Sequence, residues 1–559
     1  MQQTAAWCRQ HKNSVIFLIC VVFLVSALIG KRSAYETGDD IYINLISAGA
    51  FGAYPQYLVH TNVLYGYLLA ALNAIAPHLP WYYIVLILLN LLAVFSLCVV
   101  CCRRLSLTWS VVLTCVVSFI LTEPFYISLQ YTKQAFLYTV AGAVLLHDCL
   151  KRNGSRKQYA ASLLFLLLGF MIRDKSFLFV LPFPALFVLF ALWEGRKRPL
   201  SVFKRPLLLG IAVPLILILA AKGIDAAHYA DAEWHTFRYF NRLREDIIDY
   251  SGIDYEAHRQ AYDEKGIPEE SLLMLRALMY ADGELFTTDY LETVKEIEYA
   301  DGTNRLRFDI SLLGTTIREV FRMLYSNFLG MAFAACFLCL LVFGTNRVRL
   351  MMLCNAGLLF AEYYYLHCLA RPYLRALTGC WLAAVFVPFV FAQEEMTARE
   401  EVFRRISRAA CLLSVLFLVV YSAKQVSNLY TRKGGVLVPD SGSLDHVFTA
   451  MREDDAHRYV GFENYINDDP WQITKARYEG IYENFCFLGD WFVPSPLSLY
   501  YFRRHGLENP VRALVTEENV LFYGNEAYAQ IVTDYLQAVF PGRTFRKEPA
   551  GENLWRIDG

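Results

Sequence analysis

Two adjacent carboxylates are the strongest chemical signal in the sequence. Gly38-Asp39-Asp40 comes shortly after an apolar run, Ser14 to Gly30. Acidic residues at the edge of a membrane are costly to place there and often line a functional cavity. Asp39 or Asp40 could take a proton from an attacking hydroxyl as general base. The pair could equally be the N-cap and first-turn acid of a helix, and the two roles are compatible.

Basic residues in two later turns could bind an anion. Arg371 and Arg375 form the segment Arg-Pro-Tyr-Leu-Arg between two apolar runs, and guanidinium groups suit bidentate contacts with phosphate. Arg173 and Lys175 flank Asp174 in another short turn and are a second candidate contact. The arginines could instead extend toward lipid head groups, and Asp174 could simply neutralise its neighbours. We predict Arg371, Arg375, Arg173 and Lys175 as phosphate-binding residues.

Other chemical signals are weaker. Glu123, before Pro124, is a further candidate site residue, although a single Glu at a helix end is most often solvated surface. Paired Asp residues can hold Mg²⁺ or Mn²⁺, but further ligands for a metal are not evident. The Cys98-x-x-Cys101 pair lies inside an apolar run, and no P-loop or GxGxxG motif is present. The sequence therefore assigns no definite cofactor.

The elements that must position these residues are apolar helices. The chain has 559 residues, 56% of them hydrophobic, and its apolar residues fall in runs near the length that crosses a bilayer. Lys+Arg and Asp+Glu both number 52, so no charge excess points to nucleic acid. We predict an α-helical polytopic membrane protein with about 11 spans, at 14–30, 82–102, 106–122, 134–150, 159–172, 177–193, 206–222, 325–343, 350–367, 376–393 and 409–423.

Basic loops set the predicted orientation, because Lys and Arg concentrate on the cytoplasmic side. The loops that carry them include Arg103-Arg104, Arg196-Lys197-Arg198 and Arg404-Arg405, beside Arg399. The N-terminus is then cytoplasmic within a transmembrane domain, 1–423, whose loops 31–62 and 223–324 face outward. The apolar stretch Val63 to Ala76 would reverse this parity if it crossed the membrane, so we predict a short or bent helix there. Residues 41–51 could form an amphipathic helix along the surface.

Residues 424–559 are predicted to be an extracytoplasmic α/β domain. Short β-rich runs at Arg458 to Phe462 and Asn519 to Tyr523 precede a helical pattern from Glu526 to Phe540. Cys486 is the single cysteine of this domain, so it has no disulfide framework. This argues for a bacterial cell membrane rather than a eukaryotic secretory pathway.

This arrangement resembles the GT-C superfamily of membrane glycosyltransferases, which includes protein O-mannosyltransferases and the aminoarabinose transferase of lipid A. The resemblance rests on Asp39-Asp40 in the first outward loop, the large loop 223–324, the late Arg371 and Arg375, and the outward C-terminal domain. It is greater to poorly characterised bacterial polytopic members, which share the Gly-Asp-Asp segment, Ser47-x-Gly49-x-x-Gly52 and an Ile172-Arg173 turn. Many relatives offer an Asp in the second outward loop, where the nearest acid here is Glu123.

The resemblance implies an inverting glycosyltransferase with a polyprenyl-phosphate sugar as donor. The acceptor would be an extracytoplasmic glycan, lipid or protein. Asp39 or Asp40 would be the base, and Arg371 with Arg375 or Arg173 would bind the phosphate. Two other classes stay open: another membrane glycan polymerase or ligase, and a transporter or flippase of lipid-linked glycans. Transporters often show internal repeats, and none is visible in this sequence.

Overall fold

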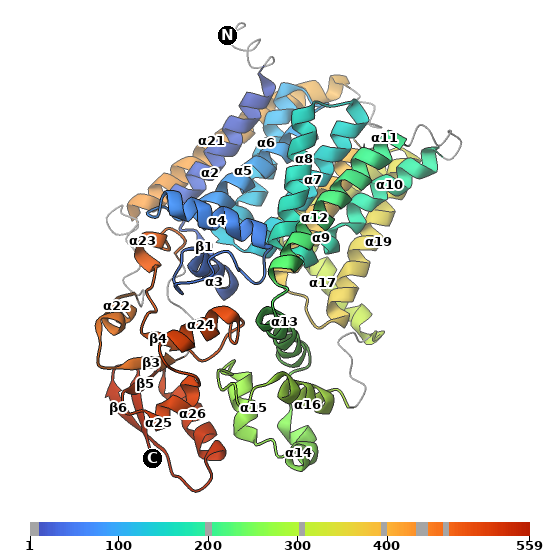
Figure 1. Ribbon diagram of the computed structural model, residues 1–559. Coiled ribbons are helices and arrows are strands. Elements are labelled where there is room, and N and C mark those ends of the chain that lie inside the picture. Colours follow the sequence, from blue (N-terminus) through green and yellow to red (C-terminus); the bar gives the residue numbers. More distant parts are fainter. Residues whose placement is uncertain (1–10, 196–203, 301–307, 393–399, 432–444, 462–468) are drawn as a thin grey trace.

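A long helical bundle and a smaller mixed domain at one of its ends make up the protein (Figure 1). The computed structural model describes residues 11–195, 204–300, 308–392, 400–431, 445–461 and 469–559. The bundle helices are α2 (Lys12–Gly30), α5 (Trp81–Cys101), α6 (Leu107–Thr122), α7 (Tyr131–Arg152), α8 (Arg156–Ile172), α9 (Asp174–Val180), α10 (Pro182–Gly195), α11 (Lys204–Leu207), α12 (Val213–His228), α18 (Phe328–Phe343), α19 (Asn346–Cys368), α20 (Leu374–Ala392) and α21 (Glu400–Thr431). Two π-helical segments, η1 (Glu123–Ile127) and η3 (Leu208–Ala212), continue α6 and precede α12.

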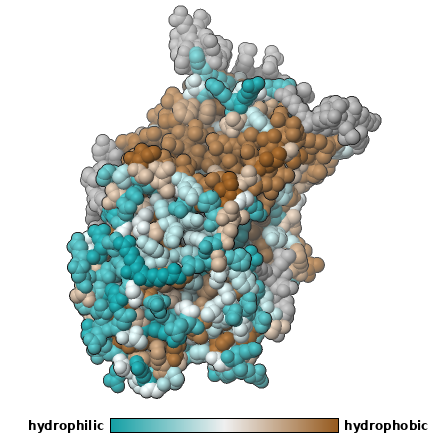
Figure 2. All heavy atoms as spheres, viewed as in Figure 1, coloured by the Kyte–Doolittle hydropathy of each residue, from teal (hydrophilic) through white to brown (hydrophobic). Residues whose placement is uncertain are grey.

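Five helical stretches in the described residues are long and apolar enough to cross a membrane: Lys12–Gly30, Trp81–Cys101, Leu107–Ile127, Leu208–His228 and Leu374–Ala392. A sixth is possible if α17 (Ser311–Ser326) and α18 act as one span, although they are bent by 94°. Figure 2 shows the hydrophobic surface as a band over the bundle, with hydrophilic surface below it. These observations fit a multi-pass membrane protein, as the sequence predicts.

The other predicted spans are less regular. The segment 177–193 is divided between α9 and α10, which meet at Leu181. α7 is 22 residues long but less apolar, and most of its residues are buried among other helices. Arg196, Lys197, Arg198 and Arg399 lie outside the described residues.

The two ends of the bundle differ in what they carry. At one end the Lys12 ammonium donates to the carbonyl oxygens of Cys102 and Leu105, at 2.5 and 2.6 Å, and Arg103 pairs with Asp148 at 2.8 Å. α2 runs from this end toward the carboxylate pair that follows it. Basic residues near Arg103 therefore lie at the end of the bundle opposite to Asp39.

Two short helices connect α2 to α5. α4 (Val63–Ile75) has 13 residues, about 20 Å of helix, which is too short for a hydrocarbon core of about 30 Å. It lies across the end of the bundle (Figure 1), as expected of a segment that does not span. α3 (Gly38–Ser47) is buried from Asp40 to Ser47, so the prediction of a surface helix is wrong. The physical reason is that the C-terminal domain covers it, with Tyr42 packed against Phe492 at 5.1 Å between ring centroids.

The large loop between α12 and α18 is helical, as the sequence predicts. Its elements are α13 (Ala232–Arg244), η4 (Glu245–Ser251), α14 (Tyr255–Glu264), α15 (Glu269–Arg276), α16 (Thr288–Glu298) and α17. α13 lies between the bundle and the C-terminal domain (Figure 1). The loop therefore joins the two parts of the molecule.

The C-terminal domain is a small α/β unit, as predicted. Its strands are β3 (Arg458–Gly461), β4 (Phe485–Phe487), β5 (Val520–Tyr523), β6 (Arg546–Gly551) and β7 (Leu554–Asp558), in the order β4-β3-β5-β7-β6. β4, β3 and β5 are parallel, while β7 is antiparallel to β5 and to β6. Its helices are α22 (Asp445–Glu453), α23 (Lys475–Tyr478), α24 (Pro496–Arg504), α25 (Pro510–Thr516) and α26 (Glu526–Val539).

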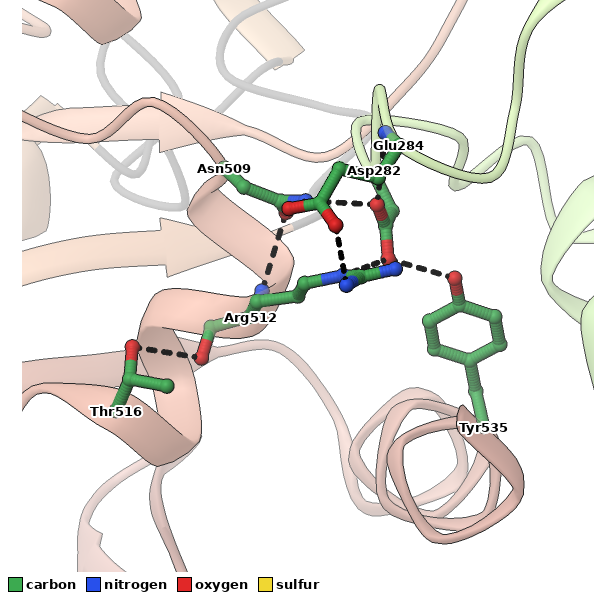
Figure 3. A network of polar contacts seen from close by, with 6 residues as sticks. All are labelled: Asp282, Glu284, Asn509, Arg512, Thr516 and Tyr535. Carbon is green, nitrogen blue, oxygen red and sulfur yellow. Dashed lines mark hydrogen bonds and ion pairs between the residues drawn. The ribbon is translucent and has the colours of Figure 1, made fainter. Parts of the chain in front are cut away.

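A buried ionic network fixes this domain to the large loop (Figure 3). The Asp282 carboxylate is fully buried and accepts hydrogen bonds from the Arg512 Nε at 2.9 Å, the Asn509 amide at 2.7 Å and the Tyr535 hydroxyl at 2.8 Å. Arg512 also pairs with Glu284 at 2.5 Å. Nearby, the chain before Asp282 pairs with the residues directly after β4, because the Ala281 N–H donates to the Leu488 carbonyl at 2.8 Å. The loop and the domain thus form one unit on one side of the bundle.

Candidate functional site

The two adjacent carboxylates have different environments. β1 (Ala34–Tyr35) pairs in parallel with β2 (Ser128–Leu129), which places the start of α3 beside the start of α7. Asp40 is fully buried and accepts from the Tyr82 hydroxyl at 2.8 Å and from the Tyr131 N–H at 2.9 Å. Burial raises the pKa of Asp40 well above its ordinary value. Asp40 therefore anchors α3 to α5 and α7.

Asp39 is the more accessible of the two. It is half-buried, and its carboxylate accepts a long hydrogen bond from the Tyr131 hydroxyl at 3.4 Å. Both Asp residues lie in the first turn of α3, and Thr37 is the N-cap, so the prediction of an Asp N-cap is wrong. Since Asp40 is held by neighbouring groups, Asp39 is the carboxylate that a substrate can reach.

Arg173 lies on the other side of the same tyrosine. Its guanidinium stacks on the Tyr131 ring at 4.7 Å from the centroid and interacts electrostatically with Asp39. Burial lowers the pKa of Arg173, and the nearby positive charge of Arg375 lowers it further. Arg375 itself stacks on Tyr373 at 4.7 Å. Asp39, Arg173 and Arg375, which are far apart in the sequence, are thus brought together.

Arg173 and Arg375 have no carboxylate within ion-pair distance among the residues that the structure describes. Two guanidinium groups near one another repel, and a bound anion reduces the repulsion. These two residues therefore form the stronger candidate for phosphate binding.

Arg371 and Lys175 form ion pairs with carboxylates of the large loop. Arg371 pairs with Asp249 at 3.2 Å and with Glu245 at 3.5 Å, and Lys175 pairs with Glu245 at 3.1 Å. Arg371 also stacks on Tyr250 at 4.3 Å. Burial acts to raise the pKa of Glu245, but Lys175 and Arg371 lower it below its ordinary value. Arg371 and Lys175 thus hold η4 over the arginine pair.

A histidine completes the border of the site. His60 is half-buried, stacks near Tyr131 at 6.5 Å between ring centroids, and contacts the Trp491 ring at 4.4 Å. Burial, assisted by Arg173 and Arg244, lowers the pKa of His60 to about 4, while Asp39 acts in the opposite direction. His60 is therefore neutral at pH 7.

Glu123 is not joined to this group of residues. It pairs with Lys31 at 2.5 Å, and both side chains are about half exposed. In the described part of the chain, no set of three or more His, Cys, Asp or Glu side chains is placed to hold a metal ion. The Mg²⁺ or Mn²⁺ that Asp39 and Asp40 could bind thus has no further ligands here, and we derive no step from it.

Part of the candidate site is not predicted by the sequence. His60, Tyr131 and Glu245 were not singled out, nor were Asp490 and Trp491 of the C-terminal domain. The signal for Asp490 and Trp491 is faint, a Gly-Asp-Trp segment directly after the apolar run Phe485–Leu488. Their role depends on how the domain docks, which no local pattern encodes.

Comparison with known proteins adds no assignment. No protein-family model matches the sequence, and no curated protein matches it. The proposed function therefore rests on the geometry of the site.

Proposed function

We propose that the protein is an inverting membrane glycosyltransferase of the GT-C kind. Its donor is a polyprenyl-phosphate sugar, and its acceptor is an extracytoplasmic glycan, lipid or protein. In this proposal about eleven segments span a bacterial cell membrane, the N-terminus is cytoplasmic, and the C-terminal domain is extracytoplasmic. The observation that carries it is the partly exposed carboxylate of Asp39 beside Arg173 and Arg375, which pair with no carboxylate of the described residues, at the end of the bundle away from Arg103.

The reaction that these groups support is a single displacement. The acceptor oxygen attacks the anomeric carbon of the donor sugar, and Asp39 takes the hydroxyl proton as general base. The bond from that carbon to the phosphate oxygen breaks, and its electron pair stays on the polyprenyl phosphate. Arg173 and Arg375 stabilise this growing charge, so they bind the phosphate more strongly in the transition state than in the ground state.

Arg371 and Lys175 have a different place in this mechanism from the one that the sequence predicts. Both are paired with loop carboxylates, so they position the loop over the site. A direct phosphate contact by either would require its ion pair to open. Asp40 holds the helix that carries Asp39.

The test uses the full chain in lipid nanodiscs with radiolabelled polyprenyl-phosphate sugars. We expect Asp39→Asn to reduce release of polyprenyl phosphate by roughly 10²–10⁴-fold while donor binding is kept. Arg173→Met should weaken both donor binding and turnover, because the guanidinium contacts the phosphate in both states.

Asp174→Asn is the matched control, because Asp174 is an exposed acid directly beside Arg173. It should turn over the donor at the wild-type rate. Wild-type turnover by both Asp39→Asn and Arg173→Met would refute the assignment. Donor binding followed by movement across the bilayer, with no sugar release, would support the flippase class instead.

A further inference from the structure

The loop after β4 brings the C-terminal domain to the edge of the site. In this loop the Asp490 N–H donates to the Leu278 carbonyl at 3.0 Å, and the Asp490 carbonyl accepts from the Tyr280 hydroxyl at 2.5 Å. Asp490 has a φ of +68°, in the left-handed region that is uncommon for a residue with a side chain. A Cβ on Gly489 would lie 1.5 Å from the Leu278 carbonyl oxygen. Strained backbone held so firmly is characteristic of functional positions.

The Asp490 carboxylate lies near the proposed general base, Asp39. It accepts from the backbone N–H of Trp491 at 2.6 Å and from the Tyr42 hydroxyl, and it interacts electrostatically with Asp39 and Arg244. Among the described residues it has no cation within ion-pair distance. Burial raises the pKa of Asp490 to about 6, and the negative charge of Asp39 acts in the same direction. Two carboxylates near one another disfavour ionisation of both, and further hydroxyl groups that donate to them offset part of this cost.

Trp491 provides the second, independent observation. Its side chain is 5% exposed and packs against His60 and, at 5.8 Å between ring centroids, against Tyr42. Its indole Nε1–H has no acceptor among the residues that the structure describes. Buried indole N–H groups usually have a partner, so this donor is available to a ligand. It lies beside His60, which borders Asp39.

We propose that Asp490 and Trp491 form the acceptor subsite, and that the acceptor is a carbohydrate with neighbouring hydroxyl groups. This inference rests on the proposed glycosyltransferase function. One sugar hydroxyl donates to the Asp490 carboxylate, and an adjacent sugar oxygen accepts from the indole Nε1–H of Trp491. A third hydroxyl attacks the donor and gives its proton to Asp39.

A carbohydrate fits better than a peptide for two reasons. The subsite pairs one acceptor with one donor, and each hydroxyl of a sugar can serve either of them, whereas a serine side chain offers a single hydroxyl. The residues directly after β4, Leu488 and Gly489, are also covered. Met279 forms an antiparallel bridge with Gly489, and Ala281 bonds to Leu488, so an extended peptide cannot add to the sheet there.

The experiment uses the full chain in nanodiscs, with Asp490→Asn and Trp491→Phe. Asn keeps the shape of Asp490 and tolerates its backbone conformation, while Phe keeps the packing of Trp491 without the N–H. The probes are a panel of octyl mono- and disaccharides, an octyl-capped serine peptide and a polyprenyl-phosphate sugar. Each variant is compared with a control in the same domain, Asp534→Asn and Trp471→Phe, which replace exposed residues.

We expect each subsite variant to raise the KM for the preferred octyl saccharide by about tenfold, the effect of one lost hydrogen bond. In Trp491→Phe, hydrolysis of the donor by water should stay within about twofold of wild type, because the phosphate contacts and the charges near Asp39 are intact. The controls should match wild type in both assays. An unchanged KM in both variants, or a serine peptide as the preferred acceptor, would overturn the inference.

Binding of the octyl saccharides, measured by calorimetry without donor, separates this inference from the proposed function. If wild type turns over no donor, the proposed function fails. Saccharide binding that Asp490→Asn and Trp491→Phe weaken would still support the subsite, and binding equal in all proteins would overturn it.

Discussion

Replacement of Arg512 by Met should loosen the contact between the large loop and the C-terminal domain. Asp282 is fully buried, whereas the Arg512 side chain is 23% exposed, so Arg512→Met leaves a buried charge with neutral donors only. Loss of one partner from a buried pair costs about 3–5 kcal/mol. Because Asn509 and Tyr535 still donate to Asp282, we expect about 3 kcal/mol, the lower end of this range.

Hydrogen exchange at the Ala281 amide measures this change locally, because Ala281 bonds to the Leu488 carbonyl across the interface. A loss of about 3 kcal/mol corresponds to a fall in protection of about 10²-fold. The matched control is Arg503→Met, which breaks an ion pair with Glu233 at 3.0 Å between side chains that are 64% and 47% exposed. Such exposed pairs contribute about 0–1 kcal/mol. Protection of Ala281 that falls no further in Arg512→Met than in Arg503→Met would show that the buried network does not hold the interface.

Gly489→Ala should separate the 278–281 segment from the chain at Gly489 and lower the thermal midpoint of the full chain. Gly283→Ala is the control, because a Cβ there meets no atom within 4 Å, and it should change the midpoint little. Equal midpoints for the two variants would contradict the close approach. The pKa of Asp490 is raised in the folded protein, so the folded state binds a proton more tightly than the unfolded state, and stability should fall as pH rises from about 4 to about 6. Asp490→Asn should reduce this pH dependence of the unfolding free energy, measured at pH 4 and pH 7, and an identical dependence in the variant would refute it. A cysteine introduced in place of Arg104 and one placed on β6 should be labelled from opposite sides of the membrane by an impermeant thiol reagent, and labelling from one side would overturn the orientation.

Some features follow directly from the sequence because they depend on local chemistry. Charge-free apolar runs such as Trp81–Cys101 form helices with apolar surfaces, since a bilayer requires every backbone group to be bonded within the segment. The strand at Val520–Tyr523 follows from a short run of apolar and aromatic residues, and the helix from Glu526 follows from a residue period of 3.6. Both patterns lie within a short stretch of sequence and require no distant contact.

The candidate site was only partly predictable. Asp39 and Arg173 were candidates from the sequence because charged residues beside apolar runs are conspicuous. The different environments of Asp40 and Arg371 were not predictable, because they depend on which neighbouring groups bond to each side chain. Asp40 is satisfied by a hydroxyl and a backbone amide from other helices, and Arg371 by carboxylates of η4.

The sequence by itself therefore determined the class of the protein, a helical membrane chain with a small α/β domain, and the presence of acidic and basic residues at one end. Only the tertiary structure decided which of these residues share a site, and that Asp490 and Trp491 of the C-terminal domain border it. The physical reason is distance along the chain. Asp39 and Asp490 are separated by about 450 residues. Their proximity depends on the buried Asp282–Arg512 network and on the pairing of the large loop with Leu488 and Gly489, contacts that arise only when the whole chain has folded.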